Sequence, residues 1–100
     1  MPSIEFSPKA GELLAELIRD RGVDDDLLDR LVGRLNEIAE NPARHTEPAK
    51  FPYPPNRLMA NFTLNDAAAK VWGVTVTLRR TPDEDGIYIL TINAAPFPFA

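Results

Sequence analysis

The 100-residue sequence contains no cysteine and a single histidine. The lack of cysteine excludes disulfide bonds, cysteine-ligated zinc and thiol catalysis. No apolar run approaches the roughly 20 residues that span a bilayer, and the N-terminus lacks the regions of a signal peptide. Phosphate-binding glycine loops, nucleophile elbows and metal-ligand clusters are also missing from the sequence. We therefore expect a cytoplasmic protein with no membrane contact, no metal and no cofactor.

The composition is that of one globular domain, with 44% apolar and 26% charged residues. A chain of this length is near the commonest size for a single domain, so we expect residues 1–100 to form one unit. The net charge of −4 is unevenly distributed. Residues 1–40 hold five basic and ten acidic side chains, whereas residues 41–80 hold six basic and two acidic ones. The second block could therefore present a positive face to a partner.

The first half of the chain predicts two helices joined by a short link. Ser7-Pro8 is an N-cap followed by proline at the first helical position, and Gly22 is typical of the residue that ends a helix. One aspartate of residues 24–26 caps the next helix, which Asn41-Pro42 stops. Each helix has an apolar stripe, made by Leu13, Leu14, Leu17 and Ile18 in the first and by Leu27, Leu28, Leu31, Val32, Leu35, Ile38 and Ala39 in the second. The two helices are expected to form an antiparallel hairpin.

The second half predicts strands after a proline-rich segment at residues 42–56, which is expected to be an extended loop. Alternating apolar residues at 58–64, 74–78 and 87–92 are typical of strands. Residues 3–6 alternate too, and residues 83–86 are typical of a hairpin turn. The fold is thus predicted to be α+β, a helical hairpin packed on a three- or four-stranded antiparallel sheet in the order β-α-α-β-β-β.

Candidate binding residues are the basic side chains of the second block. They are Arg57, Arg79 and Arg80, with Lys50 and Lys70. On alternating strands Arg57 and one of Arg79 or Arg80 could point to the face of the sheet that the helices leave uncovered and contact phosphates there. The competing interpretation is an ordinary charged solvent face, because five charges spread over thirty residues form a weak cluster.

The other polar and aromatic groups have simpler structural interpretations. His45 in the proline-rich loop is expected to be exposed, and the acidic runs at 24–26 and 83–85 are expected to be a helix cap and a hairpin turn rather than cation sites. Four aromatic residues among prolines could anchor a partner or pin the loop and the tail to the core, namely Phe51, Tyr53, Phe97 and Phe99.

Two stretches resemble the RelE/ParE toxin superfamily. Residues 4–10, Ile-Glu-Phe-Ser-Pro-Lys-Ala, followed by an amphipathic helix, resemble the opening of these toxins. Residues 35–42, Leu-Asn-Glu-Ile-Ala-Glu-Asn-Pro, resemble the end of their second helix. The strands that start at Arg57-Leu58, Val74 and Ile87 match the order of the family's sheet. The similarity covers roughly residues 3–93.

The resemblance implies a toxin that a cognate antitoxin neutralises. RelE-like members cut mRNA in the ribosome, and ParE-like members inhibit DNA gyrase. Carried over to this chain, Arg57 matches the family's basic position at the start of a strand, and Arg79 and Arg80 lie at the end of the next strand. These arginines would stabilise phosphate charge, with Tyr88 or His45 transferring a proton.

Two alternatives remain open at this stage. The chain could be a non-enzymatic interaction or regulatory module whose partner docks on the proline-aromatic loop, the tail or a sheet edge. It could also form homo-oligomers through the helical hairpin.

Overall fold

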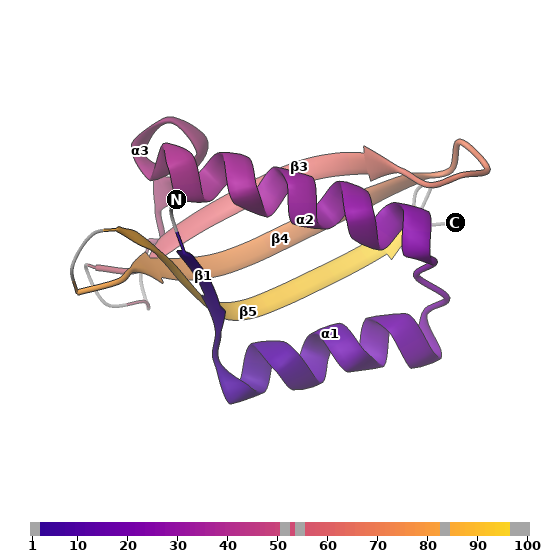
Figure 1. Cartoon of the computed structure of the whole chain (residues 1–100), viewed down its shortest axis with the longest axis horizontal. Helices are drawn as coiled ribbons and strands as arrows, with labels where there is room; N and C mark the ends of the chain where they lie inside the picture. Colours follow the sequence, from indigo (N-terminus) through magenta and orange to yellow (C-terminus); the bar gives the residue numbers. More distant parts are fainter. Residues whose placement is uncertain (1–2, 51–52, 54–55, 83–84, 97–100) are drawn as a thin grey trace.

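Two long helices lie on one face of a five-stranded sheet, as Figure 1 shows for this computed structural model. The structure describes residues 3–50, 53, 56–82 and 85–96. The elements follow the order β1 (Ser3–Phe6), α1 (Pro8–Asp20), α2 (Asp25–Glu40), α3 (Pro42–His45), β2 (Glu47–Pro48), β3 (Leu58–Asn65), β4 (Val71–Arg80) and β5 (Gly86–Pro96). Within the described ranges, no helix has the length and hydropathy that crossing a membrane requires.

Both long helices begin and end where the sequence predicts. The Ser7 hydroxyl accepts a hydrogen bond from the Ala10 amide at 3.0 Å, and Pro8 opens α1. Gly22 follows α1 with a φ of +74°, a conformation that favours glycine. Asp24 Oδ1 accepts from the Leu27 amide at 2.8 Å and caps α2. The interpretation of this acidic run as a helix cap is therefore confirmed.

The sheet has the order β1-β5-β4-β3-β2, and β1 runs parallel to β5. The α+β class and the succession of one strand, two main helices and then strands are confirmed. The predicted order lacked α3 and β2, and the prediction of a three- or four-stranded, wholly antiparallel sheet is wrong. Parallel strands need a long connection, and here the whole of the chain from α1 to β4 separates β1 from β5. The connection between the two strands sets the direction of β1 relative to β5. The four residues of β1 therefore do not indicate whether the pairing is parallel or antiparallel.

The first part of the proline-rich segment, residues 42–48, contains secondary structure and is not the extended loop predicted from the sequence. Pro42 starts the short helix α3, where the missing amide hydrogen costs nothing at the first position. Glu47–Pro48 then forms the edge strand β2, paired with Leu58 and Met59 of β3. An edge strand tolerates Pro48 because one side of it needs no ladder bonds. Of the aromatic residues predicted to anchor or pin, Phe51, Phe97 and Phe99 lie outside the described residues.

The core lies between the helices and one face of the sheet. Along β4 the even-numbered residues Trp72, Val74, Val76 and Leu78 are buried against this core. The opposite face carries the odd-numbered residues of β3 and β4 and the side chains paired with them on β5, and we call it the open face. Its members on these three strands include Met59, Asn61, Thr63, Asn65, Val71, Gly73, Thr75, Thr77, Arg79, Tyr88, Thr91, Asn93 and Ala95.

A β-bulge at Leu90 changes the alternation of β5. Thr77 pairs with Thr91, but Leu78 pairs with Ile89, so Leu90 has no partner on β4. Ile92 and Ala94 are buried beyond the bulge, and Ile87 and Ile89 are buried before it. Tyr88 therefore projects onto the open face together with Thr91 and Asn93.

Asp66 organises the turn between β3 and β4. Its Oδ1 accepts from the amides of Ala68 and Lys70 at 3.0 and 2.9 Å, and its Oδ2 accepts from Trp72 Nε1 at 3.0 Å. The hydrogen bond from Trp72, followed by that from the Lys70 amide, lowers the pKa of Asp66.

This lowered pKa predicts a contribution to stability that depends on pH. A carboxylate with a depressed folded-state pKa stabilises the fold above its unfolded-state pKa of about 3.9. The contribution is lost as the pH falls through the folded-state value. We expect Asp66→Asn to lower the melting temperature at pH 7 and to flatten its fall between about pH 5 and pH 2. Thermal melts across that range measure both effects, and parallel curves for the two proteins would contradict this role.

Candidate functional site

Arginine and tyrosine side chains meet at one end of the open face. Arg79 and Tyr88 are cross-strand partners on β4 and β5, and the guanidinium carbon of Arg79 lies 4.6 Å from the centre of the Tyr88 ring. Arg57 directly precedes Leu58, which pairs with Leu78. The Arg57 carbonyl accepts from the Ala49 amide at 2.9 Å, so the extended pairing continues through this residue. Alternation then places Arg57 beside Arg79, and we call Arg57, Arg79 and Tyr88 the arginine row.

The arginine row keeps its positive charge available. Among the described residues, ion pairs join Arg19 to Asp20, Arg30 to Asp26 and Arg34 to Glu37, and none involves the row. Arg57 is half-buried, and its Nε has no hydrogen-bond partner in the described part of the chain. A buried donor without a partner costs about 1–3 kcal/mol. The other nitrogens of the Arg57 guanidinium and those of Arg79 are the donors that an oxyanion at this end of the sheet would use.

Tyr53 adds an aromatic side chain to the same end. The guanidinium carbon of Arg57 lies 5.9 Å from the Tyr53 ring centre, and Tyr53 is 43% exposed. The exposed part of the Tyr53 ring can contact a ligand, while its face makes a cation–π contact with Arg57.

Arg80 and His45 are not in the row. Arg80 pairs with Ile87, which is fully buried, so alternation directs Arg80 to the helix side of the sheet. At this end of the sheet Arg80 lines a hollow of about 480 Å³ that Arg79 and Leu58 also line. His45 ends α3 and is half-buried, so the prediction that it is exposed is wrong. Arg57, Arg79 and Tyr88 thus lie at one end of the open face, whereas Arg80 projects from the opposite face of β4 and shares a hollow with Arg79.

Two glutamates on the edge strands were missed by sequence reasoning. Glu5 of β1 pairs with Tyr88, and Glu47 of β2 pairs with Met59, so both glutamates share the open face. The alternation of residues 3–6 places Glu5 on the face of β1 opposite to the half-buried Ile4, and it is the one weak indication in the sequence that Glu5 lies on the open face. Nothing local in the sequence indicates that Tyr88 is its neighbour.

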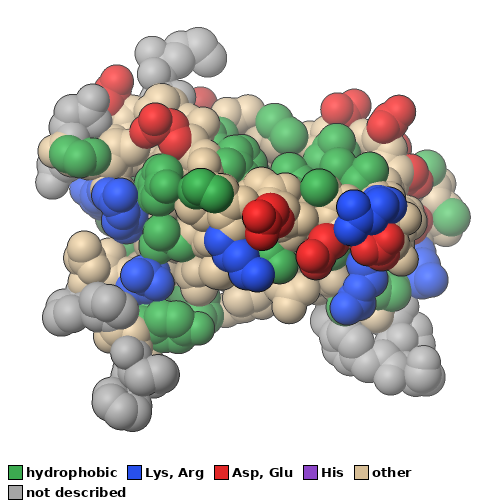
Figure 2. Space-filling view, turned by 90° about the horizontal axis from the view of Figure 1, so that it is seen from below, with side chains coloured by type: hydrophobic (Ala, Val, Ile, Leu, Met, Phe, Trp, Pro, Cys, Tyr) green, Lys and Arg blue, Asp and Glu red, His purple; other side chains and the backbone are tan. Residues whose placement is uncertain are grey.

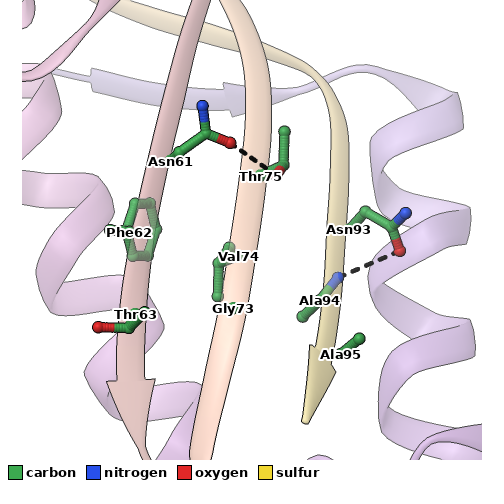
Figure 3. A pocket seen from close by; sticks show the side chains of 9 residues that line it. All are labelled: Asn61, Phe62, Thr63, Gly73, Val74, Thr75, Asn93, Ala94 and Ala95. Atoms are coloured by element: carbon green, nitrogen blue, oxygen red, sulfur yellow. Dashed lines mark hydrogen bonds between the residues drawn. The ribbon is translucent and has the colours of Figure 1, made fainter. Parts of the chain in front are cut away.

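Farther along the strands, the open face is uncharged and hollowed. Figure 3 shows this hollow between β3, β4 and β5, with a volume of about 450 Å³. Gly73 and Ala95 contribute little side chain, while the Thr75 hydroxyl donates to Asn61 Oδ1 at 2.8 Å and Asn93 Oδ1 accepts from the Ala94 amide. The surface running from the arginine row to the hollow is therefore uncharged on the three central strands, with threonine and asparagine side chains beside the apolar Met59 and Ala95.

The surface on the α1 side has a different character. Figure 2 shows acidic and basic side chains interspersed there with hydrophobic ones. The hydrogen bond from Arg19 lowers the pKa of Asp20, but both side chains are well exposed, and such pairs contribute little to stability. Among the described residues, no group of histidine, aspartate and glutamate side chains is arranged to hold a metal ion.

The arginine row can bind a phosphodiester and stabilise extra negative charge on it, because alternation places Arg57 and Arg79 on neighbouring strands and neither forms an ion pair among the described residues. Tyr88 supplies a hydroxyl group at the same place. No family model, curated protein or solved structure matches the chain, so its similarity to the RelE/ParE toxins rests on the sequence motifs alone.

Proposed function

We propose that this chain is a RelE/ParE-like toxin component that binds and cuts single-stranded RNA on the open face of its sheet. The observation that carries the proposal is the arginine row, in which Arg79 lies over Tyr88, alternation places Arg57 on the next strand, and neither arginine forms an ion pair in the described part of the chain. The guanidinium groups would hold the non-bridging oxygens of one phosphodiester. The neutral surface beyond them leaves room for the neighbouring nucleotides without charge repulsion. An antitoxin-like protein is the implied partner.

Affinity for RNA tests the binding step. We expect Arg79→Ala to weaken binding of a 2′-O-methyl RNA oligonucleotide roughly 10- to 100-fold, because a charge-assisted hydrogen bond is worth about 1.5–3 kcal/mol. The slope of log Kd against log salt concentration should also decrease by about one, the contribution of one phosphate contact. Fluorescence anisotropy at several salt concentrations measures both quantities.

Arg21→Ala is the matched control, because Arg21 is exposed at the end of α1 on the helix side of the sheet and forms no ion pair within the described ranges. It removes the same charge and should leave the affinity within about twofold, since long-range attraction between exposed charges is screened. Equal losses in the two variants would indicate a general charge effect and would contradict a specific row.

Addition of the protein to translating ribosomes tests the reaction itself. The unmodified chain should cut mRNA, and Arg57→Ala and Arg79→Ala should reduce the cutting. If mRNA stayed intact and the protein instead inhibited DNA supercoiling by gyrase, RNA cleavage would be refuted and the target would be gyrase, as for ParE-like toxins.

The non-enzymatic alternative has one observation in its favour. Ile18 of α1 and Val32 of α2 are 44% and 45% exposed, a large fraction for apolar side chains on the helix layer. A module that acts only by docking would keep its partner when the arginine row is removed. It would show neither RNA binding nor cleavage.

A further inference from the structure

The row of side chains that crosses the sheet at Arg79 continues onto the edge strand β1. Tyr88 pairs with Arg79 on one side and with Glu5 on the other. Paired residues on neighbouring strands project from the same face. Arg57, Arg79, Tyr88 and Glu5 therefore form one line across four strands on the open face.

Strand spacing sets the dimensions of this line. Neighbouring strands lie about 4.8 Å apart, so the backbones at Glu5 and Arg79 are roughly 10 Å apart with Tyr88 between them. A phosphodiester held by Arg79 over the Tyr88 ring would place its attached ribose toward the glutamate on the neighbouring strand. A general base must lie within hydrogen-bond reach of the proton that it removes.

The carboxylate of Glu5 is free to act, because it is exposed and forms no ion pair within the described ranges. The strand that carries it is nevertheless fixed at both ends. The Ser3 amide donates to the Asp85 carbonyl at 3.0 Å, and the Ser7 amide donates to the Ile89 carbonyl at 2.9 Å. The position of Glu5 opposite Tyr88 is thus set by the backbone, as a catalytic group requires.

We propose that Glu5 is the general base of the RNA cleavage, a role that rests on the proposed function. Its carboxylate takes the proton of the ribose 2′-hydroxyl, and the 2′-oxygen attacks the adjacent phosphorus. The bond from phosphorus to the 5′-oxygen breaks as the Tyr88 hydroxyl gives that oxygen its proton. The products end in a 2′,3′-cyclic phosphate and a 5′-hydroxyl. Glu5 then returns its proton to water, and Tyr88 regains one from water.

The test compares Glu5→Gln with the unmodified chain in single-turnover cleavage of an RNA oligonucleotide. Removal of a general base should slow cleavage by roughly 10²- to 10⁴-fold. The affinity for the 2′-O-methyl oligonucleotide, which cannot react, should be unchanged or slightly higher because a negative charge is lost. Because Glu5 is exposed, the melting temperature should not change.

Glu47→Gln is the matched control, since Glu47 has the same charge and lies on the same face at the opposite edge of the sheet. It should cleave at the unmodified rate. Cleavage by Glu5→Gln at that rate, or products without a cyclic phosphate, would overturn the role of Glu5. A chain that binds the 2′-O-methyl oligonucleotide but never cleaves RNA would refute this inference and leave the binding intact. A chain that does not bind it would refute the proposed function itself.

Discussion

Gly86→Ala is expected to destabilise the domain by about 3 kcal/mol or more and to separate β1 from β5. Gly86 pairs with Ser3 where the two strands begin. A Cβ atom at this position would overlap the backbone oxygen of Ser3 and lie only 2.8 Å from its backbone nitrogen. Backbone atoms cannot move aside as the end of a flexible side chain can, so the strand pair must open or shift. Urea denaturation gives the loss of free energy of unfolding.

Gly33→Ala is the control for this substitution. Gly33 lies within α2, and a Cβ atom there meets no other atom within 4 Å. Alanine in the middle of a helix should stabilise the domain by roughly 0.5–1 kcal/mol. The same chemical change is therefore expected to have opposite effects at the two glycines. A Gly86→Ala protein as stable as the unmodified chain would show that β1 is not held against β5 as described.

Ser7→Ala is expected to lower the free energy of unfolding by about 2–3 kcal/mol, because Ser7 has two roles. Its hydroxyl accepts from the Ala10 amide and caps α1, and it donates to the Leu90 carbonyl at 2.9 Å. Leu90 is the bulge residue, so its carbonyl lies where the ladder between β4 and β5 is interrupted. Alanine would remove both hydrogen bonds at a residue that is only 8% exposed.

Asp24→Ala isolates the capping contribution. Asp24 caps α2 through one hydrogen bond to the Leu27 amide and bonds no strand of the sheet. Its loss should cost about 1 kcal/mol, the usual value for a cap. Denaturation of both variants under one set of conditions gives the difference. If the two losses were equal, the bond between Ser7 and the bulge would contribute nothing.

The elements that the sequence predicts are those whose signals are local. Ser7 and Asp24 accept hydrogen bonds from amides three residues ahead, and Gly22 adopts its positive φ as an isolated residue. The alternation around Val74 reflects burial on one side of a single strand. Each of these features needs only a few neighbouring residues, so it can be derived without knowledge of the fold.

The features that escaped prediction depend on residues far apart in the sequence. The direction of β1 is set by its pairing with β5, and Pro48 becomes part of a strand only through its pairing with Leu58. The site has the same character. Arg79 and Arg80 are equivalent in the sequence, and only the pairing of β4 with β5 shows that Arg79 meets Tyr88. Glu5 lies more than 80 positions away from Tyr88, so its place in the row could not be derived from spacing.

The extra residue at Leu90 decides which side chains of β5 reach the solvent. Successive side chains of a strand point to opposite faces of the sheet. One additional residue therefore exchanges the faces to which all the preceding side chains of β5 point. With an uninterrupted ladder, Ile89 would lie opposite Arg79 where Tyr88 now lies, and Tyr88 would lie opposite Arg80 and point toward the helices. The place of Tyr88 in the arginine row therefore depends on whether an odd or an even number of residues separates it from Thr91. The types of side chain along β5 do not show this by themselves.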